Sequence, residues 1–529
     1  MIRPSPLLGN KNFLYATEFF SGMSIMAVEL GAGRLLAPYF SSSQIVWTII
    51  IGTIMIALAL GNVWGGRRAD SDADPAKLYR RLILAALWIG AIPVLGKYLI
   101  LAVAGALIIA IDTDLLIWAA FISCMAIFVA PLFILGTVTP SLVKYATDNL
   151  EHNGRIVGNL NAFNTIGSII GTFLPTFVTI PAVGTAITFL MFAGILLSIG
   201  VIYFVSVGAK KIFCAGAVIA FVTCAVVGNS NSFAFWETNL LYEGESIYNY
   251  LQVRETDDKL IFSTNVLFGV QSIKVKGGGL TGMYYDYALA APILTGGEKI
   301  LILGMGTGTF AEQCRKYFPT AQIVGVEIDE RITELAQKFF DLPDDVEVVT
   351  YDGRAFLHAD ANRYDVILVD AFQDISPPFQ MSSTEFFSLV RNHLTADGVM
   401  VVNMNMRASG AGNINEHLID TIGRIFPAMK VIDAANVTNR VLFAAGDEKI
   451  LDALRIRAEA LGDEELSALM IHTADEWRSP VRGDNILTDD RAPVEMLSMR
   501  ALDDIIRQHL RVFREIYRRE GLEGVLKYF

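Results

Sequence analysis

Cysteine and histidine are scarce in this sequence, and their scarcity excludes two kinds of site. The 529 residues include 4 Cys and 6 His. Three of the cysteines lie in long apolar runs, and no spacing among the four is typical of a metal site or a disulfide framework. We therefore predict a protein that holds no metal.

Charged residues are also few, and positive charge is in deficit. Asp, Glu, Lys and Arg make up 18% of the chain, and the formal net charge is −12. A surplus of negative charge argues against a nucleic-acid partner and is compatible with a cationic one. Charge is sparse up to about residue 229 and ordinary after it, so the composition divides the chain in two.

Long apolar runs fill the first part of the chain. A helix needs about 20 apolar residues to cross a hydrocarbon layer about 30 Å thick. The sequence predicts eight spans, near residues 12–38, 44–65, 80–95, 97–111, 115–139, 156–180, 184–207 and 211–229. The region 80–111 contains Pro93 and fits either two short helices or one long tilted helix. The first run is too long and too charged for a cleavable signal peptide.

The second part has the pattern of an α/β protein. We predict a polytopic α-helical membrane domain, a small β-subdomain, a doubly wound Rossmann-like sheet and an amphipathic helix, over residues 1–230, 240–295, 296–499 and 500–529. The β-subdomain strands are expected at 248–255, 260–263 and 272–275. The final helix has a basic face, and we favour its docking on the catalytic domain over binding to the membrane surface.

Two acids in the first apolar run invite two interpretations. Glu18 and Glu29 are eleven residues apart, which places them on one face of a helix. They either receive a cation such as a polyamine inside the bundle, or they lie near an interface or pair with another helix. A polar stripe in the sixth run, formed by Asn161, Asn164, Ser168 and Thr172 beside two glycines, favours helix packing over a transport path.

A strand that ends in three alternate glycines is the most informative motif. The apolar run 299–303 leads to Gly304, Gly306 and Gly308, where a missing Cβ lets a ligand lie against the main chain and helix N–H groups. Glu327 ends the next apolar strand, where a carboxylate accepts hydrogen bonds from both ribose hydroxyls. The G-x-G-x-G spacing is common in S-adenosylmethionine folds, whereas a nicotinamide fingerprint requires glycine at position 309.

Two further strands end in acids. Asp352 and Gly353 follow the run 346–350, and an acid there can accept a hydrogen bond from an adenine amino group. Asp370 follows the run 364–369. The sequence therefore predicts that a nucleoside binds at the carboxyl edge of a parallel sheet.

The order of these motifs resembles the spermidine synthase family. The resemblance covers roughly residues 243–405, and it rests on the stretch 243–253, Gln271, the stretch 284–292, the glycine loop, the stretch 326–329, Asp352–Gly353 and the stretch 364–370. The whole chain resembles membrane-fused spermidine synthase-like proteins. These additional likenesses lie in the basic loop 65–70 and the stretch 487–495.

This resemblance implies roles for individual residues. Gln271, Glu327, Asp352 and Gly353 hold the nucleoside, and the glycine loop lies close to the donor chain. Asp370 falls at the acid that orients and deprotonates the attacking amine in the family. Such an acid is needed because an amine with a pKa near 10.4 is a nucleophile only when it is neutral. The remaining candidates are Tyr248 and Asp286 as catalytic residues and Tyr284, Tyr285, Gln373 and Asp374 as substrate contacts.

Several positions depart from the family pattern. Tyr248–Asn249 stands where Tyr-Gln is common, and Tyr284–Tyr285–Asp286 stands where Tyr-His-Glu is common. Thr307 replaces the acid that contacts the donor's aminopropyl amine. The acid that usually follows shortly after Asp370 is missing or is shifted to Asp374. These changes weaken the expectation of decarboxylated S-adenosylmethionine as donor and putrescine as acceptor, but they leave the nucleoside site unaffected.

The sequence favours a multi-pass protein of the inner or cell membrane with a cytoplasmic catalytic domain. The basic loop from Arg67 to Arg81 belongs in the cytoplasm by the positive-inside rule. Eight spans then place both ends of the membrane domain there, although Lys144, Arg155 and the pair at 210–211 fall on the far side. Charge alone leaves the topology open, and the cytoplasmic origin of S-adenosylmethionine decides the prediction.

We therefore predict a membrane-bound aminopropyltransferase. It transfers an aminopropyl group from decarboxylated S-adenosylmethionine, or from S-adenosylmethionine itself, to a polyamine or other amine and releases methylthioadenosine. The first alternative is a methyltransferase or another enzyme that consumes S-adenosylmethionine, and the second is a polyamine transporter or sensor with a non-catalytic nucleoside domain. The expected partners are the amine and the lipid bilayer, with no nucleic acid, and a homodimer is left open.

Overall fold

The computed structural model describes residues 10–111, 113–146, 153–229, 232–266, 269–372, 376–408, 410–435 and 437–528. The chain forms two compact units. A helical unit comprises Met1–Thr238 and Gly244–Tyr250, and an α/β unit comprises Asn239–Glu243 and Leu251–Phe529. The predicted division of the second half into three domains stays a prediction.

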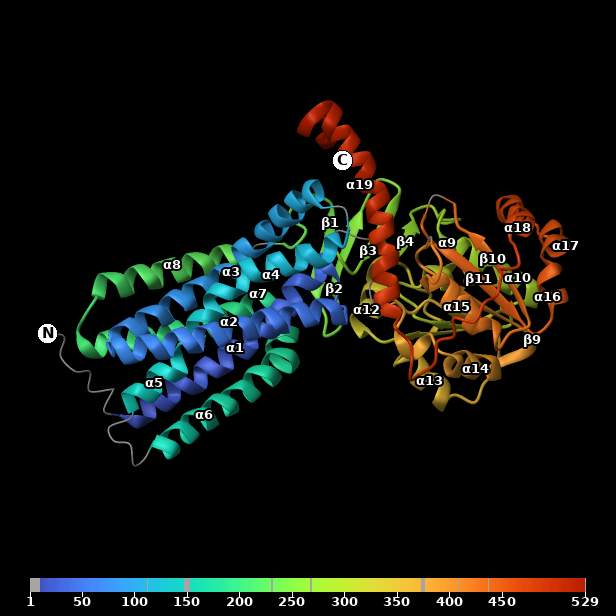
Figure 1. Cartoon of the computed structure of the whole chain (residues 1–529). Helices are drawn as coiled ribbons and strands as arrows, with labels where there is room; N and C mark the ends of the chain where they lie inside the picture. Colours follow the sequence, from blue (N-terminus) through green and yellow to red (C-terminus); the bar gives the residue numbers. More distant parts are fainter. Residues whose placement is uncertain are drawn as a thin grey trace. The chain divides into compact units, whose positions relative to one another are not determined.

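Apolar helices build the first unit (Figure 1). They are α1 Lys11–Phe40, α2 Gln44–Ser71, α3 Pro75–Ala110, α4 Leu115–Gly136, α5 Val138–Ala146, α6 Asn153–Leu174, the π-helix η2 Pro175–Thr179, α7 Ile180–Val207 and α8 Lys211–Asn229. Within the described residues, 6 continuous helical runs are long and apolar enough to cross a membrane. One of these runs is Gly154–Val207, which is 54 residues long.

The helical unit corrects the predicted number of spans. The two spans expected at 80–95 and 97–111 are one helix, α3, which continues through Pro93. Proline is tolerated inside an apolar helix because neighbouring groups satisfy the freed carbonyl. The spans expected at 156–180 and 184–207 are the long run just described, and it is broken at Gly184, where φ is 81° and ψ is 170°.

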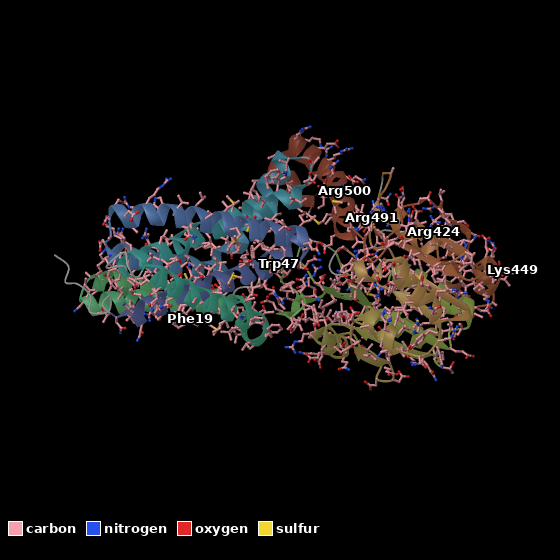
Figure 2. The ribbon with its side chains drawn as sticks, turned by 60° about the horizontal axis from the view of Figure 1, so that its bottom comes forward. Phe19, Trp47, Arg424, Lys449, Arg491 and Arg500 are labelled. Carbon is pink, nitrogen blue, oxygen red and sulfur yellow. The ribbon has the colours of Figure 1, made fainter. Side chains whose placement is uncertain are left out.

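Close packing explains the glycines of the sixth predicted span. A Cβ on Gly167 would lie 2.0 Å from the backbone oxygen of Phe19, and one on Gly171 would lie 2.1 Å from that of Met23. Figure 2 labels Phe19 on α1. Only glycine therefore lets α1 and α6 approach this closely. The packing interpretation of this stripe is confirmed.

Glu18 is bound by side chains of two other helices. It is fully buried, and one of its oxygens accepts hydrogen bonds from the Thr139 hydroxyl at 2.5 Å and the Asn164 amide at 2.8 Å. These contacts support the interpretation that this carboxyl pairs with neighbouring helices, because a charge in an apolar layer requires partners. Glu29 is half-buried.

A small antiparallel sheet precedes the large one. Its strands are β1 Leu240–Glu245, β2 Tyr250–Glu255, β3 Lys259–Ser263 and β4 Ser272–Val275, in the order β1-β2-β3-β4. Three of them match the strands predicted from alternation. The sequence analysis missed β1, whose six residues are all at least partly exposed and therefore show no alternation of buried and exposed positions.

The large sheet has seven strands in the order β10-β11-β9-β8-β5-β6-β7. They are β5 Lys299–Leu303, β6 Gln322–Glu327, β7 Glu347–Thr350, β8 Tyr364–Val369, β9 Leu394–Asn403, β10 Ala428–Asp433 and β11 Arg440–Ala445. The first five in chain order pair in parallel, and β11 is antiparallel to both its neighbours. The predicted doubly wound Rossmann-like fold is confirmed.

Helices cover both faces of this sheet (Figure 1). The helices of the α/β unit are α9 Tyr284–Ala288, α10 Ala290–Thr295, α11 Thr309–Tyr317, α12 Glu330–Phe339, α13 Gly353–Ala359, the short η3 Phe379–Met381, α14 Thr384–Asn392, α15 Ile414–Gly423, α16 Glu448–Asp452, α17 Leu454–Glu459, α18 Glu464–Glu476 and α19 Val494–Tyr528. One core cluster takes alternate residues from β5 and β8, such as Ile300, Ile302, Val366 and Leu368. Two-residue periodicity sends the intervening residues to the other face.

The final helix begins at Val494, six residues before the predicted start. Leu497, Leu502 and Leu510 are buried on it, and α19 contacts α15 within the same unit. This contact supports docking of its first half on the α/β unit.

The strand order changes direction between β5 and β8. From β5 the chain proceeds to β6 and β7 on one side, and from β8 it proceeds to β9 on the other. The loops after β5 and β8 therefore diverge at neighbouring carboxyl ends, which is where ligands bind in sheets of this kind. The fold brings the glycine loop and Asp370 to this position.

Candidate active site

The glycine loop begins at the carboxyl end of β5 and ends at the start of α11. Gly304, Gly306 and Gly308 have φ values of 85°, 58° and 81°, which side chains other than glycine rarely adopt. The N–H groups of Gly304 and Met305 both donate to the carbonyl of Val326 in β6. The loop is thereby fixed between two strands and presents backbone to a ligand.

Glu327 lies beside this loop at the end of β6. One carboxylate oxygen accepts from the N–H of Gly306 at 2.9 Å, and the other accepts from the N–H of Asp329 at 3.1 Å. Burial raises the pKa of Glu327 above its ordinary value, and these backbone donors oppose the rise. A carboxylate held in this way is ready to accept from the two hydroxyls of a ribose.

Asp352 caps the helix that follows β7. Its carboxylate accepts from the N–H of Ala355 at 2.8 Å. Capping occupies one oxygen and fixes the side chain at the N-terminus of α13. A Cβ on Gly353 would lie 3.1 Å from Met381 and 3.7 Å from Leu303, so this turn packs against the end of β5. The predicted contact with adenine stays a prediction.

Asp370 meets the glycine loop through the backbone. Its N–H donates to the carbonyl of Leu303 at 2.9 Å. A Cβ on Gly304 would lie 2.6 Å from the carbonyl oxygen of Asp370 and 2.7 Å from Ala371. The acid and the loop that were predicted separately are therefore in van der Waals contact.

Two side chains hold the carboxylate of Asp370. The Tyr284 hydroxyl donates to one oxygen at 2.5 Å, and the Asn403 amide donates to the other at 2.8 Å. Burial raises the pKa of Asp370 to about 7, both hydrogen bonds act to lower it, and the nearby charge of Glu327 raises it further. An acid with a pKa near 7 changes readily between its proton-binding and proton-releasing forms at neutral pH.

The sequence analysis missed Asn403 and the residue that orients it. Asn403 ends β9, and its amide oxygen accepts from the Asn439 amide at 3.0 Å and from the N–H of Asn405 at 2.9 Å. With the oxygen engaged in this way, the amide nitrogen is directed toward Asp370. One signal was available, because Asn403 follows a buried run just as Asp370 does.

Asp286 has a structural role at the turn before α9. It is 2% exposed, and its carboxylate accepts from the N–H groups of Thr281 and Gly282, the Thr281 hydroxyl and the Gln313 amide. These four hydrogen bonds occupy the acceptor positions of the carboxylate and fix the turn before α9. The catalytic role predicted for Asp286 stays a prediction.

Tyr285 also has a structural role, because it connects α9 with the start of β4. Its buried hydroxyl accepts from the N–H of Ile273 at 3.2 Å and lies 3.4 Å from the carbonyl of Gln271. Its ring lies 4.3 Å from that of Tyr284, centroid to centroid. Tyr285 therefore joins the start of β4 to the wall around Asp370, and the substrate contacts predicted for Tyr284 and Tyr285 stay predictions.

Thr307 belongs to the part of the glycine loop that packs against β4. It is fully buried, and its hydroxyl lies 3.5 Å from that of Thr309, which in turn donates to the carbonyl of Ile273. The loop thus rests on β4 at this point. The position carries no charge that could bind the amine of a donor.

The remaining predicted residues are Tyr248, Gln271, Gln373 and Asp374. Tyr248 is 43% exposed and belongs to the segment 244–250 of the helical unit, so its catalytic role stays a prediction. Gln373 and Asp374 lie outside the described residues. Gln271 is half-buried at the start of β4, and its nucleoside contact stays a prediction.

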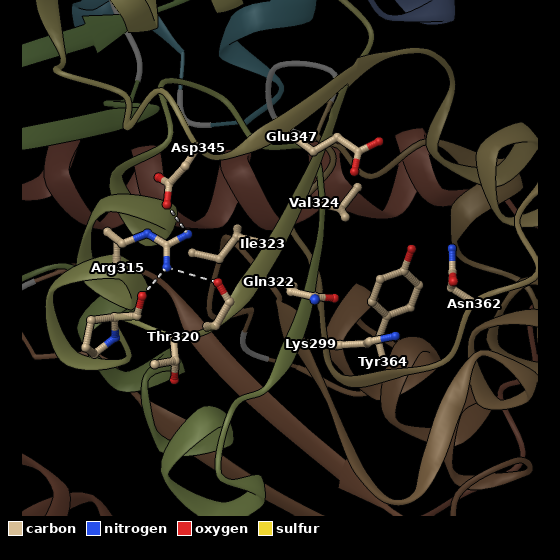
Figure 3. Close-up of a pocket in the computed structure, with 12 residues that line it drawn as sticks. Lys299, Arg315, Thr320, Gln322, Ile323, Val324, Asp345, Glu347, Asn362 and Tyr364 are labelled. Atoms are coloured by element: carbon tan, nitrogen blue, oxygen red, sulfur yellow. Dashed lines mark hydrogen bonds and ion pairs between the residues drawn. The ribbon is translucent and has the colours of Figure 1, made fainter.

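A pocket of about 500 Å³ opens at the opposite edge of the sheet (Figure 3). It lies at the amino ends of β5, β6 and β8, beside Lys299, Gln322 and Tyr364. The Arg315 guanidinium within it is bound to Asp345 at 2.9 Å and to the carbonyls of Pro319 and Ala321. The residues that line this pocket do not include the glycine loop. The Arg315 guanidinium in it is already paired with groups of the protein itself.

The site can bind a nucleoside and can accept a proton from a bound amine. The glycine loop and Glu327 provide the first capacity, and Asp370 with its two donors provides the second. Among the residues that the structure describes, no three His, Cys, Asp or Glu side chains are grouped to hold a metal. The fold is a Rossmann-like sheet, and its glycine loop with the neighbouring acids has the arrangement of the nucleoside-binding class of such folds.

Comparison with known proteins identifies the family. The spermine/spermidine synthase domain matches residues 288–429. A Bifidobacterium longum protein described as a probable polyamine aminopropyl transferase is 52% identical over 344 residues, which are 62% of this chain and 77% of that protein. The chain therefore belongs to the polyamine aminopropyltransferase family, and it is a transferase.

More distant relatives align with less of the chain. A Neisseria meningitidis polyamine aminopropyltransferase is 26% identical over 170 residues, which are 31% of this chain and 64% of that protein. The spermidine synthase structure from Thermotoga maritima has 18% identity and a TM-score of 0.37, and it covers 44% of this chain and 84% of that one.

Proposed function

We propose that the chain transfers an aminopropyl group from decarboxylated S-adenosylmethionine to a polyamine or similar amine. The observation that carries this proposal is Asp370, whose backbone lies against the glycine loop and whose carboxylate is hydrogen-bonded by Tyr284 and Asn403. It brings a proton acceptor next to the place where a nucleoside donor would lie. The family membership agrees with this arrangement.

The reaction follows from these groups. The amine binds as an ammonium ion beside the carboxylate of Asp370 and loses a proton to it. Its nitrogen lone pair then forms a bond to the aminopropyl carbon of the donor. The bond between that carbon and the sulfonium breaks, the electron pair stays on sulfur, and neutral methylthioadenosine is released. No external oxidant or reductant is needed.

Tyr284 and Asn403 keep the carboxylate in place during this exchange. Each binds a different oxygen, which fixes the plane of the carboxylate. Orientation of this kind supplies a large part of the catalysis in reactions between two bound molecules. The bound ammonium takes the place of solvent beside the carboxylate. Its positive charge favours the ionised form of Asp370.

The identity of the donor is the second part of the proposal. Thr307 lacks the negative charge that would bind the free amine of an aminopropyl donor, and this position favours methyl transfer from S-adenosylmethionine as the second candidate. The two reactions leave different nucleosides, methylthioadenosine and S-adenosylhomocysteine. Incubation of the purified chain with each donor and a panel of amines, followed by mass analysis, distinguishes them.

We also propose that the helical unit anchors the enzyme in a lipid bilayer. Its long apolar helices support this, and they carry large exposed hydrophobic residues such as Met55, Val205 and Ile219. Membrane flotation of the expressed chain before and after carbonate extraction tests the proposal. An anchored enzyme stays with the membranes, whereas recovery in the soluble fraction contradicts it.

A further inference from the structure

Positive charge gathers at one end of the helical unit. The Tyr79 ring at the start of α3 stacks on Tyr203 near the end of α7 at 4.2 Å, and its hydroxyl lies 3.3 Å from that of Thr17 near the start of α1. Lys144 of α5 pairs with Asp70 of α2 at 3.2 Å. These contacts bring the starts of α1 and α3 and the ends of α2, α5 and α7 together at what we call the basic end.

The lysines and arginines of the described helical unit are very unevenly divided between its two ends. Ten flank the basic end, namely Lys11, Arg67, Arg68, Lys77, Arg80, Arg81, Lys144, Arg155, Lys210 and Lys211. Two, Arg34 and Lys97, lie toward the other end. Lys97 donates to the carbonyl of Ser232 at 2.6 Å, and Arg34 donates to that of Ser246 at 3.1 Å.

The chain leaves the helical unit at this second end, which we call the exit end. Gly228 near the end of α8 lies 3.4 Å from Pro93 of α3, measured from its ideal Cβ. The α/β unit begins at Asn239, ten residues after α8 ends at Asn229. So short a segment cannot cross back, because a further helical crossing takes about 20 residues.

Helix direction supports the same division. α1 and α6 run parallel, since Tyr15 stacks on Phe163 and Gly167 lies against Phe19. The run from α6 to α7 reverses at Gly184, because Thr185 binds Glu245 at the exit end while Tyr203 lies at the basic end. The described residues thus make seven crossings, namely α1, α2, α3, α4, α6, α7 and α8. An odd number places Lys11 and Asn239 on opposite faces.

We infer that the α/β unit lies on the outer, non-cytoplasmic face of the membrane. Loops rich in Lys and Arg stay in the cytoplasm, and the ratio of ten to two assigns the basic end to that side. This inference rests on the proposed membrane anchoring. It opposes the cytoplasmic placement predicted from the sequence, which depended on eight crossings and on the supply of the nucleoside.

An outward-facing site has a consequence for the substrates. The amine would enter the site from the outer compartment, and methylthioadenosine would be released there. The sulfonium nucleoside is cationic and does not cross an apolar layer unaided. A transmembrane transfer step must therefore supply the donor before aminopropyl transfer takes place.

Cysteine labelling in intact cells tests this topology without reference to activity. The four native cysteines, of which Cys124, Cys214 and Cys314 are buried, are first replaced by alanine. Single cysteines are then introduced as Ser71→Cys, at the last residue of α2 at the basic end, and as Lys449→Cys in the α/β unit. Both residues are exposed, and Figure 2 labels Lys449.

An impermeant maleimide should label Lys449→Cys in intact cells and should label Ser71→Cys only after permeabilisation. The reverse pattern would place the catalytic unit in the cytoplasm and overturn the inference. Equal labelling of both positions, or of neither, before permeabilisation would contradict the odd number of crossings. Because labelling needs no substrate, failure of this test leaves the proposed reaction intact, and failure of the reaction leaves the topology intact.

Discussion

Replacing Asp370 by Asn should separate catalysis from stability. The change keeps the size of the side chain and part of its hydrogen bonding, but it removes the proton acceptor. We expect turnover to fall by roughly 10²–10⁴-fold, which is the usual contribution of a positioned acid or base. Methylthioadenosine should still bind, because Gly306 and Glu327 lie outside the substitution. Rate measurement and calorimetric titration of the full chain in detergent test both expectations.

The same substitution should stabilise the unliganded protein. Burial raises the pKa of Asp370 from 3.8 to about 7, so the folded carboxyl binds a proton more tightly than the unfolded one. Its favourable contribution is complete below pH about 4 and is lost as the pH rises to about 7. Three pKa units correspond to about 4 kcal/mol, an upper limit for the cost of ionising this group at pH 8. Asn carries no such cost.

Thermal unfolding of both proteins across pH tests this reasoning. The melting temperature of Asp370→Asn should exceed that of the parent by an amount that grows between pH 5 and 8. As a matched control, Asp365→Asn changes an acid in β8, the strand that ends just before Asp370, and we expect no comparable gain there. The reasoning is refuted if Asp370→Asn keeps near-full turnover, or if it lowers the melting temperature and abolishes nucleoside binding together.

Three other substitutions probe the neighbouring groups. Glu327→Ala should weaken methylthioadenosine binding at least tenfold, about 1.4 kcal/mol, whereas the control Glu330→Ala on α12 should not. If calorimetry gives Glu327→Ala the same affinity as the parent, the ribose contact is refuted. Asn403→Ala removes a hydrogen-bond donor that lowers the pKa of Asp370, so the acid limb of the pH profile of kcat/KM should move to higher pH. Asn362→Ala serves as a surface control. An acid limb that does not move would contradict a positioning role for Asn403. Gly304→Ala places a Cβ 2.6 Å from the Asp370 carbonyl and should reduce both turnover and nucleoside affinity; normal kinetics would show that the loop and the acid are not coupled.

The nucleoside side of the site could be predicted because its signals are local. A buried strand, three glycines and an acid at the end of the next strand lie within 29 residues, from Lys299 to Glu327. β8 was predicted with the bounds that the structure has, because a short apolar run between turn residues fixes both ends. The strand order then follows from parallel connections through helices.

The roles of the residues around Asp370 could not be predicted, because they depend on contacts between segments that are distant in the sequence. Asp286 looks catalytic in its motif, yet its carboxylate is bound by Gln313, which is 27 residues away. Asn403 carries no motif, and only the pairing of β9 with β8 places it beside Asp370. Sequence patterns along one strand cannot show such partners.

The sequence left the region 80–111 open between two helices and one for a related reason. Pro93 and the charge of Lys97 suggested a break in the third apolar region, but α3 continues through both. Lys97 is accommodated because it donates to Ser232 and lies over the rings of Tyr98 and Phe235. Charge compensation of this kind depends on the neighbouring segments and therefore appears only in the folded unit.

Identification of the nucleoside product tests the central claim most directly. The purified full chain is incubated with decarboxylated S-adenosylmethionine and a polyamine, and the products are resolved by mass. Our account predicts methylthioadenosine in equal amount to an amine that has gained one aminopropyl group, and roughly 10²–10⁴-fold less of both products from Asp370→Asn in the same time. Formation of S-adenosylhomocysteine from S-adenosylmethionine, with no aminopropylated amine from either donor, would contradict it.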